Sequence, residues 1–394
     1  MKKSSYNKVV LTLWIVFQIG PFAALFAQDN WINYTIENTP MSDHHINDIV
    51  VIDELKWVGT NWGLYTFDNT SWLDFSEFLP NNSVQSLSLD NNGMLYVGTL
   101  GGLAIYDGIN WSQITPENSL LPGHINAVVF DENNTGFIGT IDGLYKMEGD
   151  VFSLVLDSSS LEPNFVNVRS LAFKGDSLCI GTINGGLAYL FNDSIIWFNT
   201  TNGLIDNTIT DLSIKDENVW LSCPYGGLVN HLVSGSFITF NSGFFPNWPS
   251  NSLNCLLVDD EVIYVGTNEA GFFEFTYENG IQNTIVYNTQ NSELINNTVL
   301  CIEKDNDSFW IGTQEGLVHW SKSNSIFNGT SQSSYYDVNH HEILFYKKTR
   351  VELYSIEGKL LFQNQNTSTL DTRSFSRGFY ILHFDSKTER LYLF

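Results

Sequence analysis

Two aspartates recur at one position of a repeated segment and could do acid–base chemistry. Asp48 and Asp211 are the acidic members of a set that is otherwise small, namely Asp48, Ser86, Ala127, Ser170, Asp211, Cys255 and Cys301. Converging carboxylates could serve as general acid and base in a glycosidase or a polysaccharide lyase. Small size near a crowded axis explains the same set without catalysis. We therefore predict no catalytic residues, and a polysaccharide-cleaving enzyme stays the alternative.

Histidine pairs are the nearest approach to a metal site. His44-His45 and His340-His341 are adjacent in the chain, but neighbouring residues on a strand point to opposite faces and no third ligand has motif spacing. We predict no metal site and no cofactor. The sequence contains no Gly-x-Ser-x-Gly elbow, His-Glu-x-x-His motif, phosphate loop or calcium loop. Residues 88–96 approach an Asp-box of sialidases with one residue too many, and we interpret them as a turn.

The four cysteines admit two interpretations. Cys255 and Cys301 occupy matched positions in neighbouring repeats, whereas Cys179 and Cys223 lie elsewhere in theirs. An exported chain could oxidise the matched pair to a disulfide. A buried cysteine is also a common small hydrophobic residue. We favour free thiols, and the disulfide remains the alternative.

The elements that must position these residues come from a phrase that recurs seven times. It has a bulky and an aliphatic residue, Gly-Thr, two or three loop residues, and Gly-Leu. The copies are WVGTNWGL (57–64), YVGTLGGL (96–103), FIGTIDGL (137–144), CIGTINGGL (179–187), WLSCPYGGL (220–228), YVGTNEAGF (264–272) and WIGTQEGL (310–317). Their starts lie 39 to 46 residues apart, which suits one four-stranded propeller blade. The repeat predicts an all-β fold with a seven-bladed β-propeller.

Each blade is expected to contain four strands, a to d from the axis outward. Strand a carries paired aliphatic residues, strand b carries Gly-Thr, strand c begins at Gly-Leu, and strand d is a short aromatic-rich run. Because each blade is sandwiched between its neighbours, both of its faces must be apolar. This explains 11 Trp, 17 Tyr and 28 Phe in a chain of net charge −25. We expect the repeat glycines to serve turns and tight packing.

The seventh repeat has three clear strands and a doubtful fourth. Residues 31–40 precede the first strand a and have the character of an orphan strand d. We predict that this N-terminal segment completes the seventh blade and closes the ring. The alternative is that residues 325–327 form the fourth strand and that Trp31 lies outside the ring.

The two ends of the chain fall outside the propeller. Three lysines, an apolar run at 9–19 and small residues near Ala27 form the pattern of a secretory signal. A membrane anchor is the competing interpretation, but the run is shorter than the roughly 20 apolar residues that span a bilayer. Basic residues become frequent after His340, which marks a domain boundary. The predicted domains are a signal peptide at 1–27, the propeller at 28–328, a linker at 329–341 and a C-terminal domain at 342–394.

The repeats resemble a known family. The pattern W-[VI]-G-T-x-x-G-L over residues 30–328 is similar to the propeller repeats in the sensor regions of bacterial hybrid two-component regulators. Those sensors usually string two propellers together before a transmembrane helix and a kinase, whereas this sequence contains one propeller and neither of the others.

The C-terminal segment carries a second resemblance. Residues 351–362, 370–372, 378–384 and 390–394 are similar to the C-terminal sorting domain of type IX secretion. Alternating strands around Gly358 and after Gly378 independently indicate a small Ig-like antiparallel β-sandwich. The resemblance implies that the type IX machinery is a partner and that the protein is secreted or lies on the cell surface. An ordinary accessory β-domain is the alternative.

The strand directions indicate where a ligand would bind. The b–c and d–a loops emerge on one face, the b–c loop gains a residue in blades four to six, and the longest d–a loop, 241–251, lies in that sector. We predict that aromatic side chains there contact sugar rings and that Arg169 pairs with a ligand carboxylate. The predicted ligand-binding residues are Arg169, Asn184, Tyr225, Asn247, Trp248, Asn254, Asn268 and Glu269.

Composition limits the partners. An excess of 43 Asp and Glu over 18 Lys and Arg disfavours nucleic acid and anionic membrane surfaces. We expect a secreted or cell-surface binding module whose ligand is a glycan or an extracellular protein.

Overall fold

The structure is a computed structural model of the chain. It describes residues 29–157, 167–245, 247–259, 262–278, 281–322, 335–337, 342–355, 358–371, 375, 378–384 and 387–393. One compact unit is Asn30–Lys322, and another contains Ser323–Phe394; each is considered by itself. The predicted signal peptide and the predicted boundaries at 328 and 341 lie outside the described residues. Within those residues, no helix is both long and apolar enough to cross a membrane.

Seven four-stranded antiparallel sheets make up the first unit. Blade 1 contains β2 (Ile46–Ile52), β3 (Leu55–Thr60), β4 (Gly63–Phe67) and β5 (Trp72–Asp74), followed by the 3-10 helix η1 (Ser76–Phe78). Blade 2 contains β6 (Val84–Leu89), β7 (Leu95–Thr99), β8 (Gly102–Tyr106) and β9 (Trp111–Ile114). Blade 3 contains β10 (Ile125–Phe130), β11 (Gly136–Thr140), β12 (Gly143–Glu148) and β13 (Val151–Asp157). Blade 4 contains β14 (Asn167–Lys174), β15 (Ser177–Ile183), β16 (Leu187–Phe191) and β17 (Ser194–Phe198).

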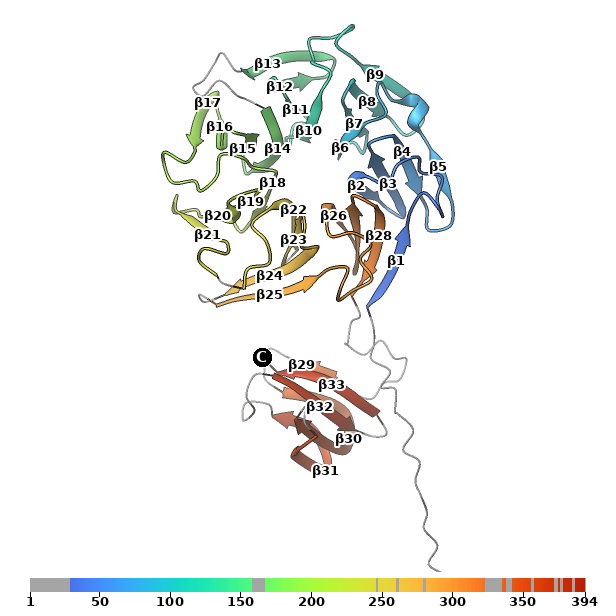
Figure 1. Cartoon of the computed structure of the whole chain (residues 1–394), viewed down its shortest axis with the longest axis vertical. Helices are drawn as coiled ribbons and strands as arrows, with labels where there is room; N and C mark the ends of the chain where they lie inside the picture. Colours follow the sequence, from blue (N-terminus) through green and yellow to red (C-terminus); the bar gives the residue numbers. More distant parts are fainter. Residues whose placement is uncertain are drawn as a thin grey trace, which may run out of the picture. The chain divides into compact units, whose positions relative to one another are not determined.

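The remaining blades continue the pattern. Blade 5 contains β18 (Asp211–Lys215), β19 (Asn218–Cys223), β20 (Gly227–His231) and β21 (Phe237–Phe240). Blade 6 contains β22 (Leu253–Asp259), β23 (Val262–Thr267), β24 (Phe272–Glu278) and β25 (Ile281–Tyr287). Blade 7 contains β26 (Val299–Asp305), β27 (Ser308–Thr313), β28 (Gly316–Ser321) and β1 (Asn30–Tyr34). The sheets form a ring with β2, β6, β10, β14, β18, β22 and β26 innermost (Figure 1).

The N-terminal strand closes the ring, as predicted. β1 pairs with β28 in antiparallel register from Asn30 opposite Ser321 to Tyr34 opposite Leu317. Each end of the propeller chain thus supplies strands to one sheet, and the inner strands β26 and β2 are also in contact. Residues 325–327, the alternative fourth strand, are outside the described residues. The closure gives blade 7 four strands, like the other six blades.

The repeated threonine closes the turn between the second and third strands. The Thr60 hydroxyl donates to the Gly63 carbonyl at 3.1 Å and accepts from the Trp62 amide at 3.0 Å. Equivalent threonine-to-glycine bonds occur in blades 2, 3, 4, 6 and 7. The glycine that ends this turn has a positive φ, for example +148° at Gly63, a conformation that side chains disfavour. The recurring phrase is therefore a turn with its own hydrogen bond.

The glycine of Gly-Thr serves packing between blades. A Cβ at Gly139 would lie 2.6 Å from Cγ1 of Val168, the residue near the start of the inner strand of the next blade. Gly59, Gly98, Gly181, Gly266 and Gly312 meet the corresponding residue of their next blades in the same way. Blade 5 has Ser222 there, and its hydroxyl lies 2.9 Å from the Thr210 hydroxyl. The prediction that these glycines serve turns and tight packing is confirmed.

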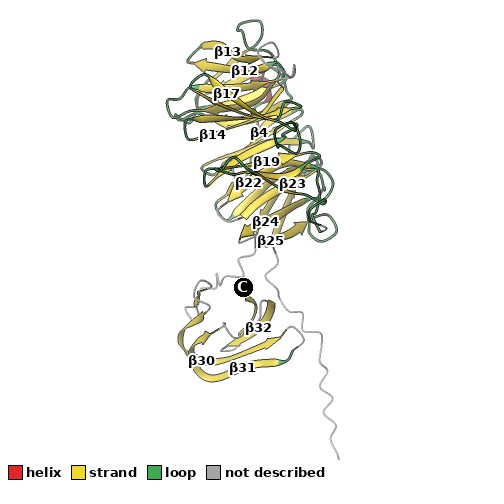
Figure 2. Ribbon diagram, turned by 90° about the vertical axis from the view of Figure 1, so that its left-hand side faces the viewer, coloured by secondary structure: helices red, strands yellow, loops and turns green. Residues whose placement is uncertain are grey.

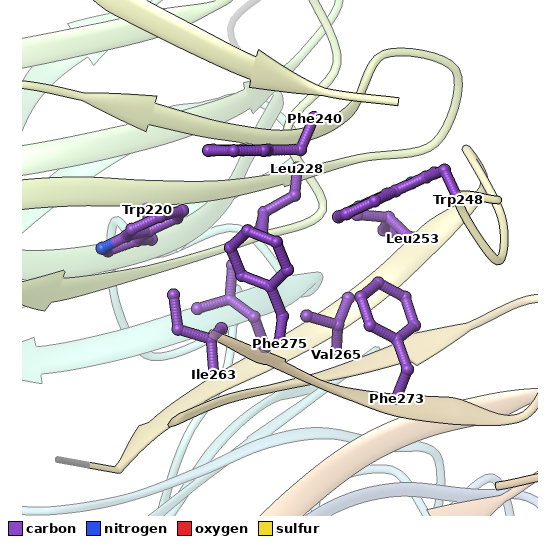
Figure 3. Packing of buried hydrophobic residues seen from close by; sticks show 10 residues of the cluster. Trp220, Leu228, Phe240, Trp248, Leu253, Ile263, Val265, Phe273 and Phe275 are labelled. Carbon is purple, nitrogen blue, oxygen red and sulfur yellow. The ribbon is translucent and has the colours of Figure 1, made fainter. Parts of the chain in front are cut away.

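Apolar clusters fill the spaces between blades. Between blades 5 and 6, Trp220 and Phe240 pack against Ile263 and Phe275 (Figure 3). Viewed from the side, the regular structure of the described residues is strand apart from the short helix η1, with loops between the strands (Figure 2). Each of the four cysteines is a buried free thiol in the structure.

The C-terminal unit contains one five-stranded antiparallel sheet among its described residues. Its strands are β29 (Tyr335–Asp337), β30 (Glu342–Ser355), β31 (Leu360–Asp371), β32 (Gly378–Phe384) and β33 (Lys387–Leu393). The order is β29-β30-β32-β33, and β31 pairs with β30. β30 and β31 form the hairpin expected around Gly358, whose φ is +83°. β29 falls inside the predicted linker, and the second layer of a sandwich stays a prediction.

Candidate functional site

One face of the ring carries all the predicted ligand-binding residues. Because adjacent strands of a blade are antiparallel, the turns between the second and third strands emerge on the same side as the loops between blades. We call this side the loop face. The loop between blades 3 and 4, residues 158–166, lies outside the described residues.

A ring of amide and hydroxyl side chains near the axis links the blades together. Its members occupy an irregularity near the start of the inner strand, where the register shifts by one residue in six blades. Four of them, Asn47, Asn126, Thr210 and Asn254, donate to a backbone carbonyl of the next blade. The Nδ2 atom of Asn254 lies 3.0 Å from the Val299 carbonyl oxygen. Asn254 therefore holds blade 6 to blade 7.

Arg169 occupies the same bulge position in blade 4 and is half-buried. Burial raises the pKa of the carboxyls of Asp48 in blade 1 and Asp211 in blade 5, and the charge of Arg169 opposes this rise in both. The guanidinium therefore lies near the inner strands of these two blades. The pairing of Arg169 with a ligand carboxylate stays a prediction.

Asp48 and Asp211 bind backbone amides across blade boundaries. The carboxylate of Asp48 accepts from Ile49 N at 2.9 Å and from Leu87 N at 2.7 Å. Asp211 accepts equivalently from Leu212 and Leu256 at 2.8 and 2.9 Å. Burial raises the pKa of Asp48 to about 7 and that of Asp211 to about 6, against the lowering effect of these amides. In both side chains, each carboxylate oxygen already accepts a hydrogen bond from a backbone amide of an inner strand. This role is structural.

Four predicted residues lie exposed on neighbouring turns of the loop face: Asn184, Tyr225, Asn268 and Glu269. The Asn184 amide donates to the Thr208 hydroxyl at 3.3 Å, and the amides of Tyr225 and Gly226 donate to Asp206 at 3.0 and 3.1 Å. Asn268 N donates to the Ser252 carbonyl at 3.0 Å. The loops between blades thus hold the turns of blades 4, 5 and 6, and the structure brings this sector together as predicted.

Trp248 is not an exposed aromatic residue, contrary to the prediction. Only 6% of it is exposed, and its ring packs edge-on against Phe273 and Phe275, 5.1 and 5.5 Å away between centroids. Figure 3 shows it inside the cluster between blades 5 and 6. An indole gains more from this apolar space than from water. Trp248 therefore anchors the 241–251 loop, and Asn247 beside it is exposed.

The loop that Trp248 anchors presents a different aromatic residue. Phe244 is 64% exposed, and its amide donates to the Asn241 carbonyl at 3.1 Å. Ser242 and Asn251 bond to each other twice, each at 2.9 Å, and join the two ends of the loop. The sequence reasoning missed Phe244, because the run Gly-Phe-Phe-Pro does not reveal which ring faces outward.

Exposed apolar side chains gather around the turn of blade 5. Tyr225 is 81% exposed, and its turn lies against Ile205 and Asp206 of the preceding loop at Gly226. The Gly226 carbonyl accepts from Asn241 at 3.1 Å, which links this turn to the loop of Phe244. We call Ile205, Tyr225 and Phe244 the blade-5 patch. Among the described residues, no group of His, Cys, Asp and Glu side chains has the arrangement of a metal site.

Comparison with known families identifies both parts of the chain. Residues 334–392 match the secretion system C-terminal sorting domain, and residues 79–101 match the two component regulator propeller. No curated protein matches the chain.

Several solved structures share the fold. The extracellular domain of a hybrid two component system from B. thetaiotaomicron is 18% identical with a TM-score of 0.65, and the match covers 93% of this chain and 57% of that one. PorZ, a surface component of the type-IX secretion system of Porphyromonas gingivalis, is 15% identical with a TM-score of 0.57, covering 90% and 60%. Virginiamycin B lyase from Staphylococcus aureus is 12% identical with a TM-score of 0.60, covering 75% and 100%. The chain spans less than two thirds of the first two proteins.

At these identities the structural likeness shows the fold alone. The chain is a β-propeller protein in which residues 79–101 match a two component regulator propeller repeat and residues 334–392 match the type IX sorting domain. The sorting domain makes it a secreted or cell-surface protein and implies the type IX secretion machinery as a partner.

Proposed function

We propose that the protein is a surface or secreted binding module that holds a glycan at the blade-5 patch. The observation that carries this proposal is the exposure of Tyr225 and Phe244 on backbone segments that hydrogen bonds hold in place. An aromatic ring exposed on a fixed backbone loses little entropy when it binds. Such rings suit the apolar faces of sugars, and neighbouring amides suit their hydroxyl groups.

The polar surroundings of the patch support a sugar more than an apolar protein surface. Exposed amide side chains flank the blade-5 patch at Asn184, Asn247 and Asn268, and a carboxylate is present at Glu269. These groups can donate and accept hydrogen bonds from a ligand with many hydroxyls. The net charge of −25 disfavours an anionic ligand. A neutral saccharide therefore fits better than the acidic one expected from the sequence.

A polysaccharide lyase or glycosidase is the second class of function. It would need an acid and a base free to reach the substrate. Asp48 and Asp211 have the raised pKa of a general acid, but their oxygens accept backbone amides. Binding without chemistry is therefore the function that we favour.

A glycan array probed with the full mature chain tests the proposal, followed by calorimetry on the glycans that bind. Tyr225→Ala and Phe244→Ala should each weaken binding by about 1–3 kcal/mol, the usual cost of removing an interface anchor. Gln85→Ala is the matched control, because Gln85 lies on the loop face in blade 2 and bonds to its own blade. Equal affinities for the Tyr225, Phe244 and Gln85 variants would refute the site.

A further inference from the structure

A second exposed aromatic residue lies on the loop face in blade 1. Trp62 is 65% exposed in the turn between β3 and β4. No other tryptophan is among the exposed large hydrophobic residues that the structure describes. A single exposed apolar residue is ordinary on a protein surface; what distinguishes Trp62 is the fixed backbone that carries it and the polar groups around it.

The backbone that carries Trp62 is fixed on several sides. Its amide donates to the Thr60 hydroxyl at 3.0 Å, and its carbonyl accepts from the Tyr65 hydroxyl at 3.4 Å. The same Tyr65 hydroxyl accepts from the Ser42 amide at 3.0 Å. The Asn61 amide donates to the His45 carbonyl at 3.2 Å. The turn and the loop at 42–45 therefore form one preorganised surface.

Polar groups of saccharide-binding type border this indole. Ser42 is exposed, and Asp43 and His44 follow it in the loop that the turn contacts. The Nδ1 atom of His44 is buried and has no hydrogen-bond partner among the described residues. Like the blade-5 patch, this surface combines an exposed aromatic ring with neighbouring hydrogen-bonding side chains, here a hydroxyl, a carboxylate and an imidazole.

Blade 1 and blade 5 lie on different sides of the ring (Figure 1), and both aromatic surfaces belong to the loop face. Between them, around the axis, lie the partly exposed polar side chains near the start of the inner strands, among them Asn47, Arg169 and Asn254. The axis therefore offers polar groups along a path from one patch to the other. The net charge of −25 disfavours a polyanion on this path.

We propose that Trp62 forms a second saccharide subsite, and that one neutral polysaccharide chain crosses the loop face from the blade-5 patch over Arg169 to Trp62. This inference rests on the proposed function and extends it from a single sugar contact to a chain. Two subsites on one ligand raise affinity because the second contact forms at high effective concentration. A short oligosaccharide can occupy the blade-5 patch only.

A length series tests the second subsite. Neutral polysaccharides (starch, xylan, mannan and β-glucan) are presented to the full mature chain, and the oligosaccharides of the polysaccharide that binds are then titrated by calorimetry. Affinity should rise with length by a factor on the order of 10². Trp62→Ala should abolish this rise and leave the affinity for short oligosaccharides unchanged. Tyr225→Ala should weaken the binding of every length.

The control is Leu120→Ala, since Leu120 is 75% exposed in the loop between blades 2 and 3 but has no ring. If Trp62→Ala leaves long-chain affinity unchanged, or weakens short and long chains equally, the second subsite is wrong while the blade-5 site stands. If Tyr225→Ala has no effect, the blade-5 site fails instead. A loss with Leu120→Ala as large as with Trp62→Ala indicates general apolar contact, as with a protein partner, and refutes the saccharide. Absence of binding to all four polysaccharides refutes both.

Discussion

Trp31 of β1 stacks on Trp320 of β28, with ring centroids 5.6 Å apart and planes inclined by 28°. This contact joins the first strand of the propeller chain to the last. Phe272 and Tyr287 of blade 6 lie 6.3 and 6.1 Å from the Trp31 ring. The closing strand is therefore held by backbone pairing and by an aromatic cluster shared with blade 6.

Replacing Trp31 should destabilise the propeller more than replacing its neighbour. Trp31→Ala removes the stacked ring and should lower the free energy of unfolding by about 3 kcal/mol, measured by guanidinium denaturation. Ile32→Ala is the control on the same strand, because Ile32 is among the exposed large hydrophobic residues. Equal losses in the two variants would mean that backbone pairing alone closes the ring.

The Lys56 side chain should stabilise the boundary between blade 7 and blade 1. Its ammonium group is buried 3.1 Å from Asp305 of that blade and donates to Glu54 O at 2.9 Å and Asn69 Oδ1 at 3.0 Å. Lys56→Ala leaves the buried carboxylate of Asp305 without its ion-pair partner. Urea denaturation should show a loss of about 3–5 kcal/mol in the free energy of unfolding.

Lys146→Ala is the matched control for Lys56. Lys146 also pairs with an acid on a strand, at 2.7 Å from Glu148, but the two side chains are 35% and 63% exposed. Lys146→Ala should lower the free energy of unfolding by less than about 1 kcal/mol. A loss at Lys146 as large as at Lys56 would contradict the assignment of a buried interblade pair.

Asp48 should make stability depend on pH. Burial raises its pKa in the folded protein to about 7, so the folded state binds a proton that the unfolded state releases near pH 4. The stability contributed by this group is full below that value and is lost as pH rises through about 7. Asp48→Asn buries no charge, so its free energy of unfolding relative to wild type should increase from about pH 5 to about pH 8.

The comparison measures Asp48 together with the effect of its charge on Glu303, whose pKa burial and that charge raise to about 7. Asp68→Asn provides the control. Hydrogen bonds from Thr70 and Ser71 lower the pKa of Asp68, so this group stays ionised over the same range and its difference from wild type should be flat. Denaturation at several pH values measures both, and a flat difference for Asp48→Asn would count against the raised pKa.

Removal of the sorting domain should block export without unfolding the propeller. A chain truncated at Ser334 lacks the matched segment 334–392. In a host with type IX secretion it should accumulate in the periplasm, whereas the full chain should reach the surface or the medium. Fractionation with immunoblotting measures this, and an unchanged melting temperature of the propeller serves as the folding control. Equal export of both chains would refute the role of the tail.

Local sequence determined the architecture of this protein. The Gly-Thr phrase predicted each turn, because the Thr60 hydroxyl and the Gly63 carbonyl that it binds are neighbours in the chain. The same holds for the hairpin at Gly358. The spacing of the phrase predicted the blades. The orphan segment at Trp31 predicted the ring closure, because an unpaired strand and an incomplete sheet require each other.

Tertiary structure alone decided the site. Trp248 is buried because Phe273 and Phe275 of blade 6 offer an apolar space, and nothing near Trp248 in the sequence reports those partners. The charge of Arg169 in blade 4 acts on two acids that come from blades 1 and 5. Exposure and electrostatics depend on which side chains the ring brings together across long separations in the chain, whereas turns depend on a few adjacent residues.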